Sequence, residues 1–327
     1  MEPWRSFFKY DPIPALVNIG NLAIQYRVRH DLLGDNAASL QSLWSMPGAR
    51  RILKKQLDSG EWPDPRKNIH EGSSTNYGMV ETYRNLGVLV EMFGFTRDHP
   101  GIQNAVEYLF TTQHHDGDFR GIYGNQYSPN YSAGILELIV RAGYSADARI
   151  DRAFRWFLDH QQREGGWTLP MQTHGVKSIE SEAVLASANV YPFQLDKPFS
   201  HMVTGIVLRA FAAHEGYAVH PDAQKAGRMI TSRFFRDDIY SSRKAASYWT
   251  KYMFPFWWTD LISVLDALSK MSFSKDLPSI HKALDYFRND QQPGGYWIYS
   301  ILKNKSAPDL AGWITWALCK VVKRFFR

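Results

Sequence analysis

The sequence has a single cysteine, Cys319, among its 327 residues. A disulfide framework and a zinc module built from several cysteines are therefore both excluded. It also has no run of about 20 apolar residues of the kind that spans a membrane, because the apolar stretch 134–142 is interrupted by Glu137 and Arg141. The first residues lack the basic-then-apolar layout of a secretory signal. We therefore expect a cytoplasmic protein without a membrane-spanning helix.

Charge of one sign is also scarce. The 38 Lys and Arg residues against 32 Asp and Glu leave a net charge of +6, and the basic residues are not concentrated in one block. Nucleic-acid-binding proteins usually carry a basic stripe or a recognisable module, so we predict no nucleic-acid partner. Aromatic residues, in contrast, are abundant: 11 Trp, 17 Tyr and 19 Phe exclude intrinsic disorder.

Four copies of the motif Gln-x3-Gly-x-Trp/Phe account for part of this aromatic content. They begin at Gln56, Gln113, Gln161 and Gln291 and end at Trp62, Phe119, Trp167 and Trp297, respectively. The starts are 57, 48 and 130 residues apart. Because 130 is twice 65, a degenerate copy is expected midway, near residues 229–240. We interpret the glycine as a tight turn, the glutamine as a partner for helix-end backbone groups, and the aromatic ring as a wedge between repeat units.

Helical periodicity surrounds these motifs. Amphipathic segments with apolar residues at i, i+3, i+4 and i+7 precede them, as at 102–110, 150–158 and 280–287. More evenly apolar segments follow at 77–92, 131–141, 201–213, 259–270 and 312–323. Pro100, Pro221 and Pro278 stand near expected helix starts, and Gly94, Gly143 and Gly216 at expected left-handed helix ends. No period-2 strand pattern competes, so the sequence predicts an all-α fold with an outer ring of amphipathic helices and an inner ring of evenly apolar ones.

The motifs and the helix pairing resemble those of a known superfamily. The motifs are similar to the QW repeats of squalene and oxidosqualene cyclases, which share an α/α toroid with protein prenyltransferase β-subunits. More closely, the segments 21–33, 254–260 and 312–315 resemble those of short, single-toroid prenyltransferase/squalene-oxidase repeat proteins. The resemblance covers residues 11–326. It implies one α/α-toroid domain of about five to six helix pairs over residues 1–327, with a central cavity for an isoprenoid.

The acid motifs of terpene cyclases are incomplete here. Class II cyclases, as the resemblance implies, use Asp-x-Asp-Asp to protonate an alkene or epoxide. Asp116 and Asp118 are followed by a phenylalanine in place of the third acid, and Asp237 and Asp238 lack the first acid. We interpret both pairs as solvated loop carboxylates. The class I pattern Asp-Asp-x-x-Asp fails as well, because Ser241 replaces its last acid.

The zinc site of protein prenyltransferases, which needs Asp, Cys and His, is also not recognisable. Cys319 lies in an apolar helix and has the pattern of a buried small residue. His114, His115 and Asp116 could bind a metal, but adjacent histidines in a polar loop usually do not. We therefore predict no metal and no cofactor.

Aromatic residues at the starts of the evenly apolar helices are expected to surround one mouth of the toroid. The candidate substrate-binding residues are Tyr77, Tyr131, His201, Trp257, Trp258 and Trp313. Aromatic walls suit a polyprenyl or other flat apolar ligand and can stabilise a cation. Asp260, and after it Glu81, are the candidate catalytic acids, because burial would raise the pKa of a carboxyl group at this position. In the alternative interpretation, the aromatic rings simply fill the centre of the toroid.

Two further segments carry hypotheses. The stretch 168–200 is long for a connection between helices, and we predict that it is a lid over the ring mouth. The ends, 4–9 and 320–327, mix aromatic and basic residues and suit peripheral contact with an anionic membrane. The alternative for these ends is a packed terminal helix with a solvated basic face.

Three functions remain open at this stage, and the sequence leaves undecided whether a reaction occurs. The first is a terpene cyclase-like enzyme that uses acid catalysis in an aromatic cavity. The second is a non-catalytic scaffold that binds a lipid or peptide. The third, which the Gln/Trp motifs disfavour, is a carbohydrate-active α/α toroid with paired carboxylates. An enclosed aromatic cavity with a buried carboxyl group would favour the first function, and a filled ring the second.

Overall fold

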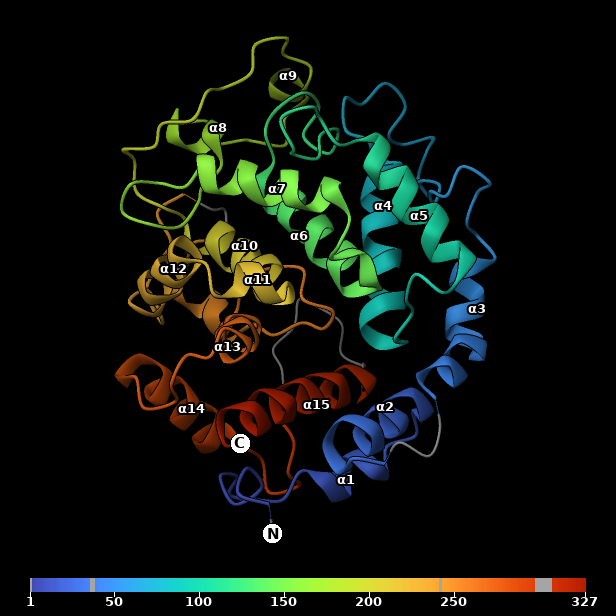
Figure 1. The fold of residues 1–327 in the computed structure, drawn as a ribbon, viewed down its shortest axis with the longest axis vertical. Coiled ribbons are helices and arrows are strands. Elements are labelled where there is room, and N and C mark those ends of the chain that lie inside the picture. The colour runs from blue at the N-terminus through green and yellow to red at the C-terminus, as the bar shows by residue number, and fades with distance from the viewer. Residues whose placement is uncertain (1, 36–38, 241–242, 298–307) are drawn as a thin grey trace.

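The computed structural model describes residues 2–35, 39–240, 243–297 and 308–327, and these contain fifteen α-helices and no β-strand (Figure 1). Six helices form an inner layer: α2 (Leu22–Arg27), α4 (Tyr77–Gly87), α6 (Pro129–Ile139), α10 (His201–Ala213), α13 (Leu261–Lys270) and α15 (Pro308–Phe325). Six form an outer layer: α1 (Ile13–Val17), α3 (Pro47–Leu53), α5 (Pro100–Thr111), α7 (Ala148–Asp159), α12 (Pro221–Thr231) and α14 (Pro278–Asp290). The remaining three are short: α8 (Pro170–Thr173), α9 (Glu182–Leu185) and α11 (Glu215–Ala218). One-turn π-helical segments, Val28–Leu32, Val88–Met92 and Val140–Tyr144, extend α2, α4 and α6, and 3₁₀ turns form at Leu40–Ser45 and Ala246–Thr250.

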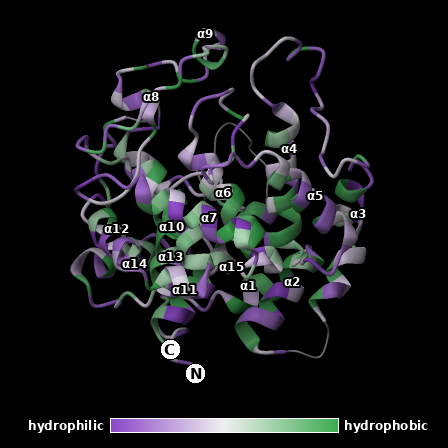
Figure 2. Ribbon diagram, turned by 45° about the horizontal axis from the view of Figure 1, so that its top comes forward, coloured by the Kyte–Doolittle hydropathy of each residue, from purple (hydrophilic) through white to green (hydrophobic). Residues whose placement is uncertain are grey.

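The inner helices pack side by side in chain order. Helix α4 contacts α6, α6 contacts α10, α10 contacts α13, and α13 contacts α15, which in turn packs against α2. A hydrogen bond of 3.0 Å from Arg27 Nη2 to the carbonyl oxygen of Glu91 joins α2 to the turn after α4. The inner layer therefore closes into a ring, and the predicted all-α arrangement in two concentric layers is confirmed. Figure 2 shows hydrophobic residues gathered on α6 and α10, and hydrophilic residues on many of the connecting loops.

Most of the predicted helix boundaries are also observed. Pro100, Pro221 and Pro278 are the first residues of α5, α12 and α14, where a missing N–H is harmless. Gly94 and Gly143 have φ of 65° and 100°, the left-handed conformation expected at a helix end. The prediction is wrong for Gly216, which lies inside the short helix α11. None of the helices in the described ranges is both long enough and apolar enough to cross a membrane.

The glutamines of the four motifs make one kind of joint between neighbouring helix pairs. Each Nε2 donates to a backbone carbonyl at or near the start of the next outer helix: Gln56 to Gly101 (2.8 Å), Gln113 to Arg149 (2.9 Å), Gln161 to Asp222 (3.0 Å) and Gln291 to Tyr10 (2.7 Å). The last of these bonds joins the final repeat to the first. The repeated hydrogen bond therefore also closes the outer layer.

The glycine and the aromatic residue of each motif complete this joint. Gly117 has a φ of 119°, and a Cβ atom there would lie 2.5 Å from the carbonyl oxygen of Arg152 in the next outer helix. Only glycine allows this close approach of two backbones. The indole N–H groups of Trp62, Trp167 and Trp297 donate to the carbonyl oxygens of the residues ten positions earlier, Ile52, Phe157 and Phe287. Each tryptophan therefore fastens its loop to the end of its own outer helix.

Candidate functional site

A partly enclosed cavity of about 330 Å³ lies among the inner helices, and we call it the mouth cavity. Its walls come from α4, α6, α10, the stretch before α13 and the segment 168–200. The lining residues are Tyr83, Arg84, Tyr123, Asn130, Tyr131, Leu169, Gln172, Lys177, Ile179, Glu180, Met202, Val203, Ile206, Arg243, Trp257 and Trp258. Small-molecule pockets usually measure about 300–1,000 Å³, so this cavity can hold a small ligand or part of a longer one.

Only half of the predicted substrate-binding residues line the mouth cavity. Tyr131, Trp257 and Trp258 do. Tyr77 stacks on His70, with ring centroids 3.6 Å apart, in a shallower depression that adjoins Tyr131. The structure therefore brings three of the six candidates together at one cavity, and their role in binding stays a prediction.

His201 and Trp313 are core residues instead. The His201 ring packs against Trp249, and burial lowers its pKa although Asp238 lies 3.7 Å away. Trp313 stacks on Phe254 and contacts the edge of another tryptophan. For these two residues the alternative interpretation, in which aromatic side chains fill the ring, describes the structure better.

Asp260 has the electrostatics expected of a catalytic acid but a structural position. It is 1% exposed, and burial raises its pKa to about 7, against the opposite effect of nearby N–H groups and of Arg209. However, Asp260 Oδ1 accepts a hydrogen bond of 2.8 Å from the backbone N–H of Ser263, and Ser263 Oγ accepts one from the N–H of Asp260. This capping box starts α13. Asp260 does not line the mouth cavity.

Glu81 is also outside the lining of the mouth cavity. Its carboxylate accepts a hydrogen bond of 2.7 Å from Arg84 Nη1, one turn further along α4. Arg84 does line the cavity. The structure therefore places Glu81 beside a cation of the cavity and not in contact with its interior.

Tyr83 is a wall residue that the sequence analysis missed. Its ring packs edge-to-face on Trp257, with centroids 5.3 Å apart. Glycines make room for both rings, because a Cβ atom on Gly134 would lie 2.5 Å from Tyr83 Oη and one on Gly87 would lie 2.6 Å from Trp257 Cη2. A glycine four residues after Tyr83 on the same helix face was the available signal.

A buried charged cluster lies beside Tyr83 and was missed as well. Arg209 Nε pairs with Glu137 Oε2 at 2.9 Å, and its Nη2 and Nη1 donate to the carbonyl oxygens of Phe256 (2.8 Å) and Trp258 (3.3 Å). Arg209 is 2% exposed and Glu137 is likewise buried. This guanidinium therefore holds the stretch of chain that carries two of the cavity tryptophans.

Further ion pairs extend the cluster. Arg141 Nη1 lies 3.1 Å from Glu137 Oε1 and 2.5 Å from Glu91 Oε1, and these two carboxylates raise the pKa of Arg141 against the effect of burial. Glu137 and Arg141 are the residues that interrupt the apolar run 134–142. The centre of the ring is thus partly a cavity and partly packed with paired charges.

The segment 168–200 supplies Leu169, Gln172, Lys177, Ile179 and Glu180 to the mouth cavity. It is fastened at Glu182, whose carboxylate accepts hydrogen bonds from Ser74 N (2.7 Å) and Ser73 Oγ (3.1 Å). It is fastened again at Asn189, whose carbonyl accepts from Gln126 Nε2 at 2.8 Å. The segment therefore forms one wall of the cavity in this conformation.

None of the acids in the incomplete motifs lines the mouth cavity, and half of them are buried. Asp118 pairs with Arg120 Nε at 2.9 Å. Asp238 accepts hydrogen bonds from Ser200 Oγ (2.7 Å) and from the N–H of Met202 (2.9 Å). The prediction of solvated loop carboxylates is therefore wrong for these two acids, whose side chains stabilise neighbouring loops and the start of α10.

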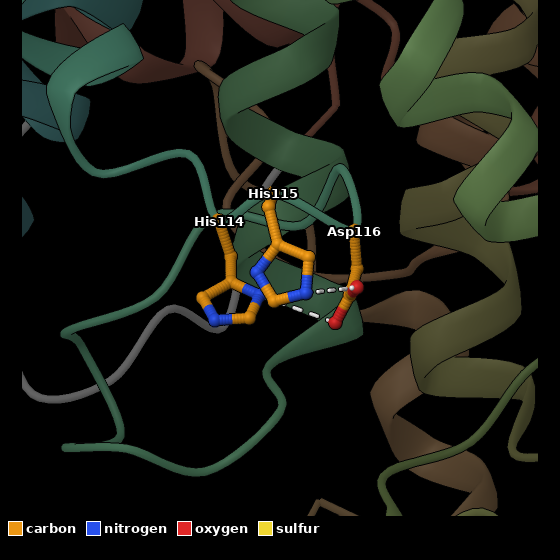
Figure 3. A group of neighbouring side chains, drawn as sticks. All are labelled: His114, His115 and Asp116. Carbon is orange, nitrogen blue, oxygen red and sulfur yellow. Dashed lines mark hydrogen bonds and ion pairs between the residues drawn. The ribbon is translucent and has the colours of Figure 1, made fainter.

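His114, His115 and Asp116 form the one group in the described residues whose ligand atoms are close enough to hold a metal ion (Figure 3). His114 Nδ1 and His115 Nε2 lie 3.1 and 2.9 Å from the carboxylate oxygens of Asp116. Arg120 Nη2 lies 3.5 Å from the same carboxylate. Asp116, the one carboxylate of this group, therefore already has a cation beside it, and the group lies outside the lining of the mouth cavity.

Comparison with known proteins gives a likeness for part of the chain. Residues 79–192 match the family model of the squalene-hopene cyclase C-terminal domain. This stretch is squalene cyclase-like. It runs from α4 to just beyond α9 and includes Tyr83, Tyr131 and most of the segment 168–200. No curated protein matches the sequence.

Among solved structures, the chain is similar to type II terpene cyclases. A variant of the cyclase MstE from Scytonema, in complex with geranylgeranyl dihydroxybenzoate, is 12% identical over 88% of this chain and 85% of that one, with a TM-score of 0.41. The apo form of MstE is 14% identical over 88% and 99% of the two chains, with a TM-score of 0.33. A protein from Actinoplanes is 12% identical over the same shares, with a TM-score of 0.32.

Proposed function

We propose that the protein binds an isoprenoid-like ligand in the mouth cavity. The observation that carries this proposal is the partly enclosed space lined by the aromatic rings of Tyr83, Tyr131 and Trp257 and by the aliphatic side chains of Val203 and Ile206. Aromatic and aliphatic walls remove the apolar surface of a ligand from water. The squalene cyclase-like character of residues 79–192 supports an isoprenoid as the apolar chain. The segment 168–200 then acts as the lid that closes over the bound ligand.

Native mass spectrometry and lipid extraction of the purified protein provide the first test, because a bound isoprenoid should co-purify. Titration with a C15 or C20 prenyl alcohol then measures affinity. Ile206→Trp should fill the cavity while leaving its aromatic walls in place, and we expect at least tenfold weaker binding. Ile69→Trp adds the same indole at a site that is 76% exposed and serves as the control. Unchanged binding by a folded Ile206→Trp protein would exclude the mouth cavity as the site.

Acid catalysis by Asp260 is the second candidate function. It is favoured by the pKa of the Asp260 carboxyl group, which burial raises to about 7. Its position at the start of α13, outside the cavity lining, favours binding without this acid. Asp260→Asn keeps the side-chain oxygen that caps the helix while removing the acidic proton. If Asp260→Asn loses turnover of a prenyl substrate while Glu81→Gln keeps it, Asp260 is the acid.

Neither a carbohydrate substrate nor a membrane partner gains support from the geometry. Glu180 is the one carboxylate among the described residues that line the mouth cavity, whereas sugar hydrolysis uses a pair. At the chain ends Trp4, Phe8 and Phe325 are buried, and Phe7 packs on Phe326 with centroids 5.1 Å apart. This packing favours the alternative of a packed terminal helix. The predicted solvated basic face is not seen there, because Lys320 lies near Asp31, Lys323 bonds to the Leu32 carbonyl and Arg324 pairs with Asp266.

A further inference from the structure

We propose that the ligand of the mouth cavity carries an anionic group, a carboxylate or a phosphate, that binds to Arg84, Lys177 and Arg243. This inference rests on the proposed function and specifies the chemical class of the ligand. It differs from the purely apolar ligand that the aromatic residues suggested, because it assigns the two ends of the cavity to two different parts of one molecule.

The three cations come from separate parts of the chain and converge on one cavity. Arg84 belongs to α4, Lys177 to the segment 168–200, and Arg243 to the loop between α12 and α13. Glu180 is the only acid among the described lining residues, which leaves a local balance of 3 − 1 = +2. All four side chains are exposed, so the charge gathers at the open end of the cavity.

The cations also act on the interior of the cavity. Burial raises the pKa of Tyr131, Glu180 raises it further, and Arg84 and Arg243 oppose both effects. Tyr131 is a wall residue of the cavity. The two arginines are therefore close enough for their field to reach a group that a ligand would touch.

Existing contacts orient both arginines. Arg84 makes one hydrogen bond to Glu81, and a guanidinium has five N–H groups. The Arg243 guanidinium lies over the ring of Trp258, 5.2 Å from its centroid. An arginine that is already oriented loses less side-chain entropy when it binds a carboxylate or phosphate in a bidentate manner.

The other end of the cavity has the opposite character. Met202, Val203 and Ile206 on α10 are buried and apolar, and Trp257, from the stretch before α13, lines the same cavity. A neutral hydrocarbon would fill this end but would not neutralise the exposed cations. An amphiphile with an acidic head and an apolar tail matches both ends of the cavity.

Calorimetric titration with a matched C15 series tests this inference. The series is a prenyl alcohol, the corresponding carboxylic acid and the corresponding monophosphate, with inorganic phosphate as the headgroup alone. We expect at least one of the acids to bind about tenfold more tightly than the alcohol, about 1.4 kcal/mol at 25 °C. The preference should weaken at high salt, because exposed charges are screened. The stronger of the two acids identifies the headgroup.

Variants assign the preference to the three cations. The triple variant Arg84→Gln, Lys177→Gln, Arg243→Gln should bind the alcohol as before and lose the preference for the acid to within about twofold. Glu180→Gln should strengthen binding of the C15 carboxylic acid and monophosphate and leave binding of the alcohol unchanged. Arg155→Gln is the matched control, because it removes an exposed arginine that pairs with Asp151 on α7 and that does not line the mouth cavity.

The outcomes separate the two proposals. If the alcohol binds and neither acid binds more tightly, the anionic headgroup is excluded while the proposed function stands. The inference is also overturned if the triple variant still prefers the C15 acids over the alcohol. It is overturned as well if inorganic phosphate binds as tightly as the C15 monophosphate. If no member of the C15 series binds, the proposed function itself fails.

Discussion

At the residue scale, the position of a side chain decides how its chemistry can be used. Asp260 is buried and its pKa is raised to about 7, as predicted for a candidate acid. Yet its Oδ1 accepts the Ser263 N–H, and its Oδ2 is buried without a partner that meets normal hydrogen-bond geometry. A raised pKa therefore marks a buried carboxyl group here without placing it at the site. Its effect on stability is measurable whether or not it is catalytic.

Asp260 should make the protein less stable as the pH rises from about 4 to about 7. In this range the folded protein holds a proton on Asp260 that the unfolded chain has released, so unfolding becomes easier with increasing pH. A difference of about 3 pKa units corresponds to about 4 kcal/mol at most. Chemical unfolding of the wild type and Asp260→Asn at several pH values measures this effect. The stability of the variant relative to the wild type should increase between these pH values, and parallel profiles would contradict the assignment.

At the element scale, the stretch before α13 is held by charge inside the ring. Arg209 on α10 binds Glu137 on α6 and the carbonyl oxygens of Phe256 and Trp258 at the same time. Three separate elements thus meet at one buried guanidinium. Removal of one partner from such a pair leaves the other groups desolvated and unpaired.

Arg209→Met should therefore destabilise the protein by about 3–5 kcal/mol and weaken binding in the mouth cavity by displacing Trp257 and Trp258. Urea unfolding and near-ultraviolet circular dichroism measure these two effects. Arg155→Met, on the exposed face of α7, is the control for loss of an arginine. The double variant Arg209→Met, Glu137→Leu should lose less unfolding free energy than the sum of the two single variants, because Glu137 no longer leaves a carboxylate oxygen without its Arg209 partner. Additive losses of unfolding free energy would argue against a coupled pair.

At the scale of the whole molecule, closure of the ring depends on contacts between residues far apart in sequence. Gln291 and Tyr10 exchange two hydrogen bonds, Nε2 to the Tyr10 carbonyl at 2.7 Å and the Tyr10 N–H to Oε1 at 3.1 Å. A Cβ atom on Gly295 would lie 2.7 Å from the carbonyl oxygen of Asp11. The last repeat thus joins the first as neighbouring repeats join within the chain, which supports the prediction of a single domain.

Gln291→Ala should lower the free energy of unfolding by about 1–3 kcal/mol, because the partly buried backbone groups of Tyr10 and the Gly295 carbonyl lose their partner. A single domain should unfold in one transition, with coincident circular dichroism and tryptophan fluorescence curves. Gln292→Ala is the matched control, since within the described residues its side chain donates to the Asp290 carbonyl two positions earlier and not to the first repeat. Two separate transitions in the wild type would contradict the single-domain prediction.

The helix positions and most helix ends could be predicted from the sequence, because each depends on residues close together in the chain. Helices α4 and α10 lie where the apolar periodicity at 77–92 and 201–213 placed them, with the π-helical turn Val88–Met92 completing the first. Proline and glycine positions marked most helix ends for the same reason, since they act on the backbone of their own residue. Ser272, with φ of 62°, shows that a left-handed turn after α13 forms even without glycine.

The composition of the cavity depends on contacts that no local pattern encodes. Trp257 lines the cavity and Trp313 does not, although both stand at starts of inner helices, because the stretch before α13 reaches inward to Arg209 and Tyr83. The cations of the mouth come from three segments that are unrelated in sequence and meet only in the folded ring. Periodicity and motif spacing thus specify the helices, their order and their joints, whereas the closed ring alone decides which side chains face the ligand.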